Sequence, residues 1–212
     1  MKKYSPVLAA ACGVVIFASC AGIQPQRTRP PSVPPETVPV KPERPLPPDE
    51  IMGKGKVSGE KLAAFLLETN SGADVDFTGS LAAFYIDEAA AEGVNHDTAF
   101  AQMCLETGFL RYGGLVTADK NNFCGLGAIG PEQPGLTFPD PQTGVRAHIQ
   151  HLKAYASQSP LNNELVDPRY RYVKLGSSPT IQGLAGTWAA DKLYSEKIAA
   201  ILERLYDFVY SE

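Results

Sequence analysis

The chain has 212 residues, a formal net charge of −4 at pH 7, and a composition of 44% hydrophobic and 20% charged residues. This length has room for one ordinary domain with accessory segments. The mild acidity argues against a nucleic-acid binder, which normally carries a basic excess. The only histidines are His96, His148 and His151, and a pair three residues apart without a third ligand is not a zinc signature. We therefore expect no metal site and no cofactor.

The first twenty residues have the features of an export signal rather than of a folded element. Two lysines at positions 2 and 3 precede an apolar run over residues 7–18, which is too short to span a bilayer as a stable helix. Phe-Ala-Ser-Cys at 17–20 resembles a bacterial lipobox. We expect 1–20 to be a lipoprotein signal peptide and Cys20 to carry a lipid that anchors the protein to a membrane, outside the cytoplasm. A plain signal peptide or an uncleaved anchor is the alternative.

Residues 21–56 are predicted to be a disordered tether. Ten prolines lie between Pro25 and Pro48, with few large apolar residues. Such a segment cannot bury a core and favours extended polyproline conformations, which rise about 3 Å per residue. The tether is expected to hold a domain, residues 57–212, some tens of ångströms from the membrane. An inert spacer or a docking segment for a partner are the other interpretations.

From residue 57 onward, apolar residues recur at helical spacing and no strand series of any length appears. Start and stop signals predict helices from Ser58 to about Asn70, from Thr78 or Ser80 to Gly93, from Asp97 to Gly108, from Thr143 or Gly144 onward, over 181–188 and over 194–210. Residues 113–138 are rich in Gly, Pro and Asn and are predicted to be loops with a short hairpin at most. The domain is therefore expected to be mainly α.

Glu106 is the most informative residue of this domain. It ends an apolar segment, Ala-Gln-Met-Cys-Leu-Glu-Thr-Gly over 101–108, and the glycine-rich segment Asn-Asn-Phe-Cys-Gly-Leu-Gly follows over 121–127. An anion in the last turn of a helix, with apolar neighbours, has a raised pKa. A carboxyl group kept protonated at neutral pH is a general acid, which predicts sugar-cleaving chemistry if the two segments meet. The alternative is a charged residue that faces water.

Four segments in this order resemble the glucosaminidase family of bacterial autolysins and flagellar muramidases, within the lysozyme-like superfamily. They are residues 101–108, 121–127, 138–152 and 186–198. The resemblance implies a lysozyme-like α-helical domain with a short loop or small hairpin lobe beside the cleft. It also implies hydrolysis of the β-1,4 bond of peptidoglycan between N-acetylglucosamine and N-acetylmuramic acid, on the reducing side of the former. Glu106 matches the family's general acid.

Substrate contacts are expected from the glycine-rich segment and from two aromatic residues: Asn121, Asn122, Phe123, Gly125, Trp188 and Tyr194. The amide of Asn122 and the backbone around Gly125 can bind an N-acetyl group, with its methyl against Phe123. Trp188 and Tyr194 can stack on sugar rings. Core packing is the alternative for both aromatics, and bonding to loop backbone is the alternative for Asn121.

A second catalytic group is harder to assign. Glycosidases commonly use two carboxylates, and the possible second carboxylates are Glu132 and Asp191, with Asp119 and Asp140 as further candidates. The family also uses a tyrosine at the position of Trp188, and an indole has no phenolic group. Assistance by the substrate's own acetamido group would remove the need for a protein nucleophile.

Two cysteines belong to the expected domain. Cys104 and Cys124 can form a disulfide or remain two buried free thiols. A basic group either binds anionic wall polymer or is a solvated face, and it consists of Arg146, His148, His151, Lys153, Arg169, Arg171 and Lys174. The protein is expected to act as a monomer on peptidoglycan. A lytic transglycosylase and a non-catalytic wall-binding lipoprotein are the competing functions.

Overall fold

The computed structural model describes residues 44–211. The expected signal peptide, the expected lipidation of Cys20 and the expected tether up to residue 43 lie outside this part of the chain. Among the described helices, none combines the length and the apolar character needed to cross a membrane.

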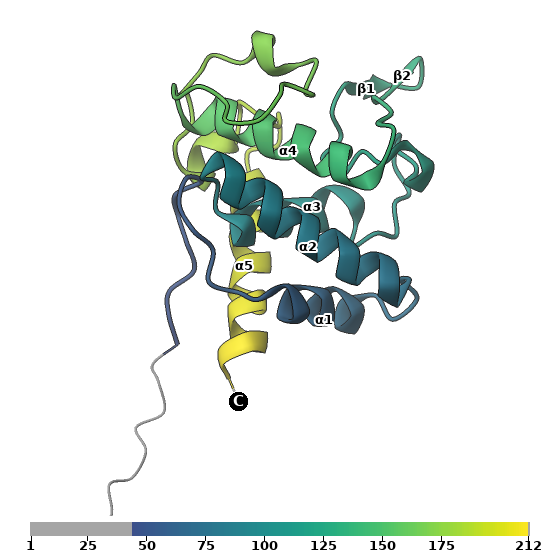
Figure 1. Cartoon of the computed structure of the whole chain (residues 1–212), viewed down its shortest axis with the longest axis vertical. Helices are drawn as coiled ribbons and strands as arrows, with labels where there is room; N and C mark the ends of the chain where they lie inside the picture. The colour runs from purple at the N-terminus through teal and green to yellow at the C-terminus, as the bar shows by residue number, and fades with distance from the viewer. Residues whose placement is uncertain (1–43, 212) are drawn as a thin grey trace, which may run out of the picture. The chain divides into compact units, whose positions relative to one another are not determined.

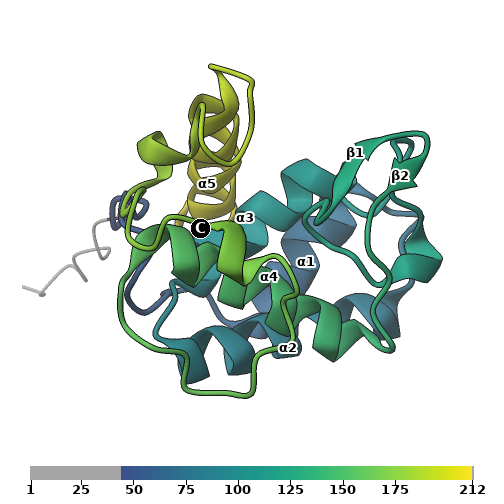
Figure 2. The same cartoon turned by 90° about the horizontal axis from the view of Figure 1, so that it is seen from above.

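The described chain folds mainly into helices, which confirms the expected fold class (Figure 1). The elements are α1 (Gly59–Thr69), α2 (Val75–Glu92), α3 (His96–Thr107), η1 (Ala118–Lys120), β1 (Ala128–Gly130), β2 (Gln133–Pro134), α4 (Pro141–Ala156), η2 (Tyr170–Tyr172), η3 (Ile181–Leu184) and α5 (Tyr194–Tyr210). The strands form one antiparallel hairpin, in which Ala128 pairs with Pro134 and Gly130 with Gln133. The predicted short hairpin is therefore present, and it lies at the edge of the molecule away from α5 (Figures 1 and 2).

Polar side chains at the helix starts explain most of the boundaries. Ser58 caps α1 as predicted, accepting from the backbone N–H of Lys61 at 3.4 Å. The predicted starts of α2, α3 and α4 are wrong by a few residues, because earlier residues cap them: Asp74, Asn95 and Asp140. Each of these side chains accepts a hydrogen bond from a first-turn N–H, which relieves an unpaired donor at the helix end.

Helix ends follow the glycines, and one predicted helix is shorter than expected. Gly93 and Gly108 end α2 and α3 with φ of 72° and 59°, which glycine adopts without steric cost. The helix predicted over 181–188 is a 3-10 turn over Ile181–Leu184, after which the chain bends back on itself. This bend carries Trp188, so its position depends on loop structure rather than on a helix face.

Helix α3 occupies the centre of the domain. All of its residues from His96 to Cys104 are buried, and it packs against α2, α4 and α5. Aromatic pairs surround it, for example Tyr85 of α2 at 5.6 Å from Phe100, ring centre to ring centre. A buried helix of this kind holds its last turn rigidly, and that turn carries Glu106.

The domain begins earlier than the predicted boundary at residue 57. Ile51 is fully buried, its N–H donates to the carbonyl of Pro179 at 3.1 Å, and its carbonyl accepts from the N–H of Asn95 at 2.8 Å. Arg44 forms ion pairs with Glu203 and Asp207 of α5. The expected tether over 21–56 is thus wrong for residues 44–56, because Ile51 is buried in the core and Met52 packs against it.

Two ion pairs join α2 to α4. Lys153 contacts Glu92 at 2.8 Å with both side chains buried, and Arg146 contacts Glu88 at 2.8 Å. Burial is the largest single influence on the pKa of Glu88 and raises it. The hydrogen bonds from Arg146 and Gln142 together outweigh burial, so the pKa of Glu88 is lowered. Two members of the expected basic group are therefore neutralised inside the fold, and the group is not one continuous charged face.

Candidate active site

Glu106 lies in the last turn of α3, one residue before the helix ends. The chain then runs through an unusual turn in which Phe109, Leu110 and Tyr112 all have positive φ, at 58°, 62° and 57°. Thr107 holds this turn, since its hydroxyl oxygen accepts from the N–H of Leu110 at 3.0 Å. Left-handed conformations are costly for residues with a side chain and concentrate at functional sites. Here the turn brings Tyr112 to the cavity that contains Glu106.

The carboxyl group of Glu106 is bonded on one oxygen only. The hydroxyl of Tyr194 and the indole Nε1 of Trp188, the latter at 3.2 Å, both donate to Oε1. The other oxygen, Oε2, faces Gly125, where an added Cβ would lie 3.5 Å away. Because two donors occupy Oε1, a proton on this carboxyl group belongs on Oε2.

The pKa of Glu106 is raised. Burial is the largest cause, and the hydrogen bonds from Tyr194 and Trp188 oppose it by favouring the ionised form. Glu106 is exposed to solvent as a residue, while Tyr194 and Trp188 cover the Oε1 side of its carboxyl group. A raised pKa is what a general acid requires at neutral pH.

A chain of buried hydrogen bonds runs from α2 to Glu106. Tyr85 lies 2.8 Å from Nδ1 of His148, and Nε2 of His148 lies 2.9 Å from Oε1 of Gln102. Nε2 of Gln102 donates to the hydroxyl oxygen of Tyr194 at 2.8 Å, and Tyr194 donates to Glu106.

The direction of this chain follows from its members. Burial, followed by the nearby His151, lowers the pKa of His148 to about 3, so its ring is neutral and has one N–H. That N–H, on Nε2, faces the acceptor oxygen of Gln102, and Nδ1 accepts from Tyr85. Each donor therefore points toward Glu106, which leaves Tyr194 with its own proton free for the carboxylate.

Two neighbouring cavities share Gly125 and Ala128 in their linings. One, of about 210 Å³, contains Glu106 and Tyr112. The other, of about 290 Å³, contains Trp188. Trp188 lines one cavity and donates to Glu106, which lines the other, so this pair lies between the two hollows. A larger cavity elsewhere, about 400 Å³ beside Phe65, contains none of these residues.

The structure does not bring all of the predicted substrate contacts to these cavities. Phe123 is fully buried, 6.5 Å from the ring of Phe77, and its predicted contact with substrate is wrong. Asn122 is also buried, and its side-chain amide bonds to the loop backbone. Nδ2 donates to the carbonyls of Leu126 and Leu136 at 2.9 and 3.0 Å, and Oδ1 accepts from the N–H of Leu126 at 3.0 Å. It shapes the loop and has no face for a ligand.

Asn121 bonds to the loop backbone, which was the alternative to its predicted contact with substrate. It has a left-handed φ of 50° and donates to the carbonyl of Phe138 at 3.1 Å. Its own carbonyl lies against Gly144, where an added Cβ would approach to 1.8 Å. This contact joins the loop to the start of α4 and requires glycine at that position. Gly125, in contrast, lines both cavities.

The two aromatic residues differ in their exposure. Tyr194 is only 5% exposed, so its ring cannot stack on a sugar, and that expectation is wrong. Its hydroxyl reaches Glu106 instead and supplies the phenolic group that Trp188 lacks. Trp188 lines the second cavity and packs against His151 and Tyr155, with ring centres 5.0 and 5.4 Å away.

The candidate second carboxylates lie apart from Glu106. Glu132 is exposed in the hairpin turn, Asp191 pairs with Lys197 at 2.6 Å, and Asp140 caps α4. Asp119 is exposed on η1. None of the four lines either cavity at Glu106.

Cys104 and Cys124 are both buried and free, which answers the open question of a disulfide in favour of two thiols. Burial raises the pKa of each thiol, and the charge of Glu106 adds to this for Cys124. Such thiols are poor nucleophiles. Among the residues that the structure describes, no group of three or more His, Cys, Asp or Glu could hold a metal ion.

Sequence reasoning missed most of the hydrogen-bond chain. Gln102 had a signal, since it lies four residues before Glu106 and therefore on the same face of the helix. His148 and Tyr85 had none, because their partners are 46 and 63 residues away in the sequence. Tyr112, which also lines a cavity, had no signal because its position follows from the loop conformation, whereas Arg169 was already named in the expected basic group.

Known proteins resemble this chain in sequence and in structure. The glucosaminidase family model, described as mannosyl-glycoprotein endo-beta-N-acetylglucosaminidase, matches residues 82–207. A Borreliella burgdorferi relative, described as an uncharacterized protein, is 44% identical over 158 residues, which cover 74% of this chain and 78% of the relative. Two crystal structures of S. aureus autolysin E, one with a muropeptide and one of a catalytic mutant with the disaccharide NAG-NAM, each align over 75% of this chain and 71% of theirs, at 15% and 14% identity and a TM-score of 0.47. The family match covers more than half of the chain, so the protein belongs to the glucosaminidase family and is a glycoside hydrolase.

Proposed function

We propose that the protein hydrolyses peptidoglycan at the β-1,4 bond between N-acetylglucosamine and N-acetylmuramic acid, with Glu106 as the general acid. One observation carries the proposal: one oxygen of Glu106 accepts from Tyr194 and Trp188, and the other faces Gly125, which lines both cavities. Membership of the glucosaminidase family supports the substrate class.

In this proposal the proton leaves Oε2 of Glu106 for the glycosidic oxygen as the bond from that oxygen to C1 breaks. Gly125 allows the substrate to approach, because its missing side chain leaves Oε2 uncovered. The ionised carboxylate that results is stabilised by the two hydrogen bonds on Oε1, which strengthen as negative charge develops. The same two donors limit how far burial can raise the pKa of Glu106.

The second catalytic role falls to the substrate. Within the described part of the chain, Glu106 lines one of the two cavities, and no other carboxylate lines either of them. The acetamido oxygen of N-acetylglucosamine then bonds to C1 as the leaving group departs, and water opens the resulting ring, returning a proton to Glu106. This route retains the configuration at C1, because two displacements occur at that carbon.

The cellular setting is part of the same proposal. A lipid on Cys20 and a proline-rich tether would place a monomeric domain outside the cytoplasm, within reach of the wall. The tether in this proposal ends near residue 43, since the folded domain already includes residues 44–56.

Purified sacculi provide the test. The soluble fragment from residue 44 onward and its Glu106→Gln variant are incubated with sacculi, and new reducing ends are measured. We expect release by the wild type and a loss of at least a hundredfold with the variant, the usual minimum for a general acid. Glu132→Gln and Asp191→Asn remove one carboxylate each outside the cavities and should keep activity within about twofold. Equal activity of wild type and Glu106→Gln would contradict the proposal.

A further inference from the structure

The cavity beside Trp188 has a cationic side chain in its lining. Arg169 supplies this charge, and among the described residues no carboxylate side chain lines the cavity. Arg169 is exposed and is in no ion pair that the structure records. The cavity that contains Glu106 has no cationic side chain in its lining. The two hollows on either side of the Glu106–Trp188 pair therefore differ in charge.

Arg169 is held in place by buried groups. The carboxylate of Asp167, which is 1% exposed, accepts from the N–H of Arg169 at 2.8 Å and from Nδ1 of His151 at 2.7 Å. Oε1 of the buried Gln150 accepts from the N–H groups of Val166 and Asp167, at 2.8 and 3.2 Å. These bonds attach the loop before η2 to α4, so the backbone of Arg169 has a defined position at the cavity.

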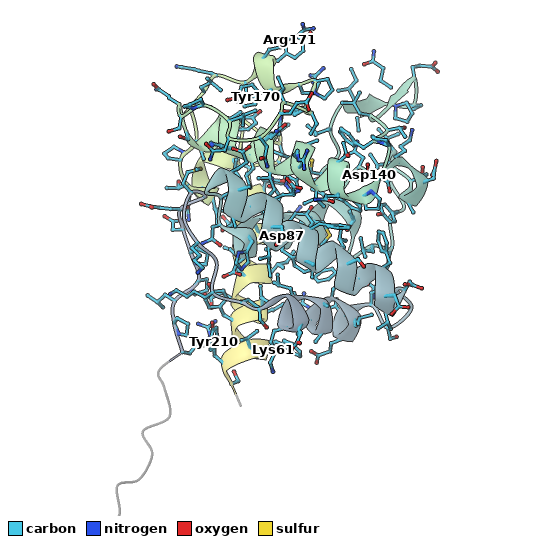
Figure 3. The ribbon with its side chains drawn as sticks, viewed as in Figure 1. Lys61, Asp87, Asp140, Tyr170, Arg171 and Tyr210 are labelled. Carbon is cyan, nitrogen blue, oxygen red and sulfur yellow. The ribbon has the colours of Figure 1, made fainter. Side chains whose placement is uncertain are left out.

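The surrounding segment is basic although the whole chain is acidic. Residues 168–190 contain Arg169, Arg171 and Lys174 and no Asp or Glu, against a net charge of −4 for the chain. The guanidinium of Arg169 lies 5.0 Å from the ring centre of Tyr172. Arg171 bonds to the hydroxyl of the same tyrosine at 2.7 Å and lines neither cavity at Glu106. It lies at the outer tip of the loop (Figure 3).

We propose that the cavity beside Trp188 holds the sugar that carries a carboxylate, and that Arg169 binds this carboxylate. The inference rests on the proposed function, since peptidoglycan alternates a neutral sugar with N-acetylmuramic acid, which has a lactyl group. That group presents either its own carboxylate or a stem peptide with further carboxylates. A guanidinium matches a carboxylate in geometry and charge. The strand therefore crosses the site with its leaving-group sugar on the Trp188 side and neutral N-acetylglucosamine beside Tyr112.

Three soluble oligomers of equal length test this proposal: a neutral N-acetylglucosamine oligomer, an alternating glycan without peptides, and the same glycan with stem peptides. Arg169→Gln should raise KM roughly tenfold on the alternating glycan, the size of one lost charge-assisted hydrogen bond, with kcat unchanged. On the neutral oligomer, KM should stay within about twofold of the wild type. An increase in KM already seen without peptides assigns the contact to the lactyl carboxylate, and one seen only with peptides assigns it to the stem.

Arg171→Gln is the matched control, because it removes the same charge two residues away. It should leave KM within about twofold on every oligomer. An equal loss with Arg171→Gln, an equal loss on the neutral oligomer, or no effect of Arg169→Gln on any oligomer would overturn the proposal.

A binding measurement separates this inference from the proposed function. Trp188 is the only tryptophan of the chain, so its fluorescence reports occupancy of the cavity directly. In a Glu106→Gln background, the alternating glycan should bind roughly tenfold more weakly when Arg169→Gln is added. This result would stand even if the wild type released no reducing ends from sacculi, an outcome that contradicts only the proposed function. Unchanged affinity would contradict the carboxylate contact itself.

Discussion

The hydroxyl of Tyr194 donates a hydrogen bond to Oε1 of Glu106 across 88 residues of sequence. The tyrosine is the first residue of α5, and the glutamate is in the last turn of α3. Packing of these two helices therefore determines the position of the proposed acid. Nε2 of Gln102 donates a hydrogen bond to the phenolic oxygen of Tyr194, so the hydroxyl of Tyr194 acts as a donor toward Glu106.

Replacing Tyr194 by phenylalanine should move the pH profile in a defined direction. The hydrogen bond from Tyr194 lowers the pKa of Glu106, against the larger effect of burial. Without this hydrogen bond the pKa of Glu106 rises and the acid stays protonated to higher pH. The alkaline limb of the kcat/KM profile therefore moves to higher pH. The maximum rate should fall roughly tenfold or more, the cost of one hydrogen bond to a charged group. A limb that moves to lower pH would contradict this account.

Gln102→Leu should lower kcat roughly tenfold with little change in KM, because it frees Tyr194 to rotate without removing a substrate contact. Tyr85→Phe removes only the far end of the hydrogen-bond chain and should have a smaller effect on kcat. Steady-state kinetics on soluble glycan oligomers measure both. An effect of Gln102→Leu on KM alone would show that the residue binds substrate rather than positioning Tyr194.

Gly125→Ala should reduce both stability and activity. The residue has a φ of +71°, where a side chain costs about 1–2 kcal/mol, and its Cβ would lie 3.5 Å from Oε2 of Glu106. We expect at least a tenfold loss of kcat/KM and a lower midpoint of urea unfolding. Gly130→Ala in the hairpin is the control, since nothing lies within 4 Å of its added Cβ. Equal behaviour of the two variants would show that Oε2 is not the reacting oxygen.

Acid should destabilise the protein through His148. Its pKa is about 3 in the folded state against an ordinary value of 6.5. Below pH 6.5 the unfolded chain therefore takes up a proton that the folded chain refuses. The free energy of unfolding then falls as the pH drops from 6.5 toward 3, by at most about 1.4 kcal/mol per pH unit from this group. Urea unfolding at several pH values should show a shallower dependence for His148→Gln than for the wild type, and identical slopes would contradict the assignment.

Much of the fold could be predicted from local sequence. The end of α2 at Gly93 and of α3 at Gly108 follows from glycine, and α5 from the periodicity of its apolar residues. The starts of the helices were less predictable. Several neighbouring residues can each cap a helix N-terminus, and tertiary packing selects which of them does so. Asp97 illustrates this: it was predicted to cap α3 and is instead buried, where it accepts from the hydroxyl of Tyr206 at 2.8 Å.

The site was predictable only where its chemistry is local. Glu106 and Gly125 could be inferred from their motifs. The roles of Asn122 and Phe123 could not, because a residue in a glycine-rich loop can either bind a ligand or hold the loop together. In the structure the loop folds over both, so they face inward. Likewise, the phenol beside Glu106 comes from the start of α5, a long-range contact that no local pattern reports.

The end group of the products shows which bond is cleaved and how. Sacculi digested by the wild type are reduced with borohydride and analysed by mass spectrometry, beside a Glu106→Gln digest. We expect products that end in reduced N-acetylglucosamine, absent with the variant. Products that end in reduced N-acetylmuramic acid would contradict the proposed bond, and anhydro-muramic ends would replace hydrolysis by transglycosylation. Sacculi that are bound but release nothing would leave a wall-binding protein without catalytic activity.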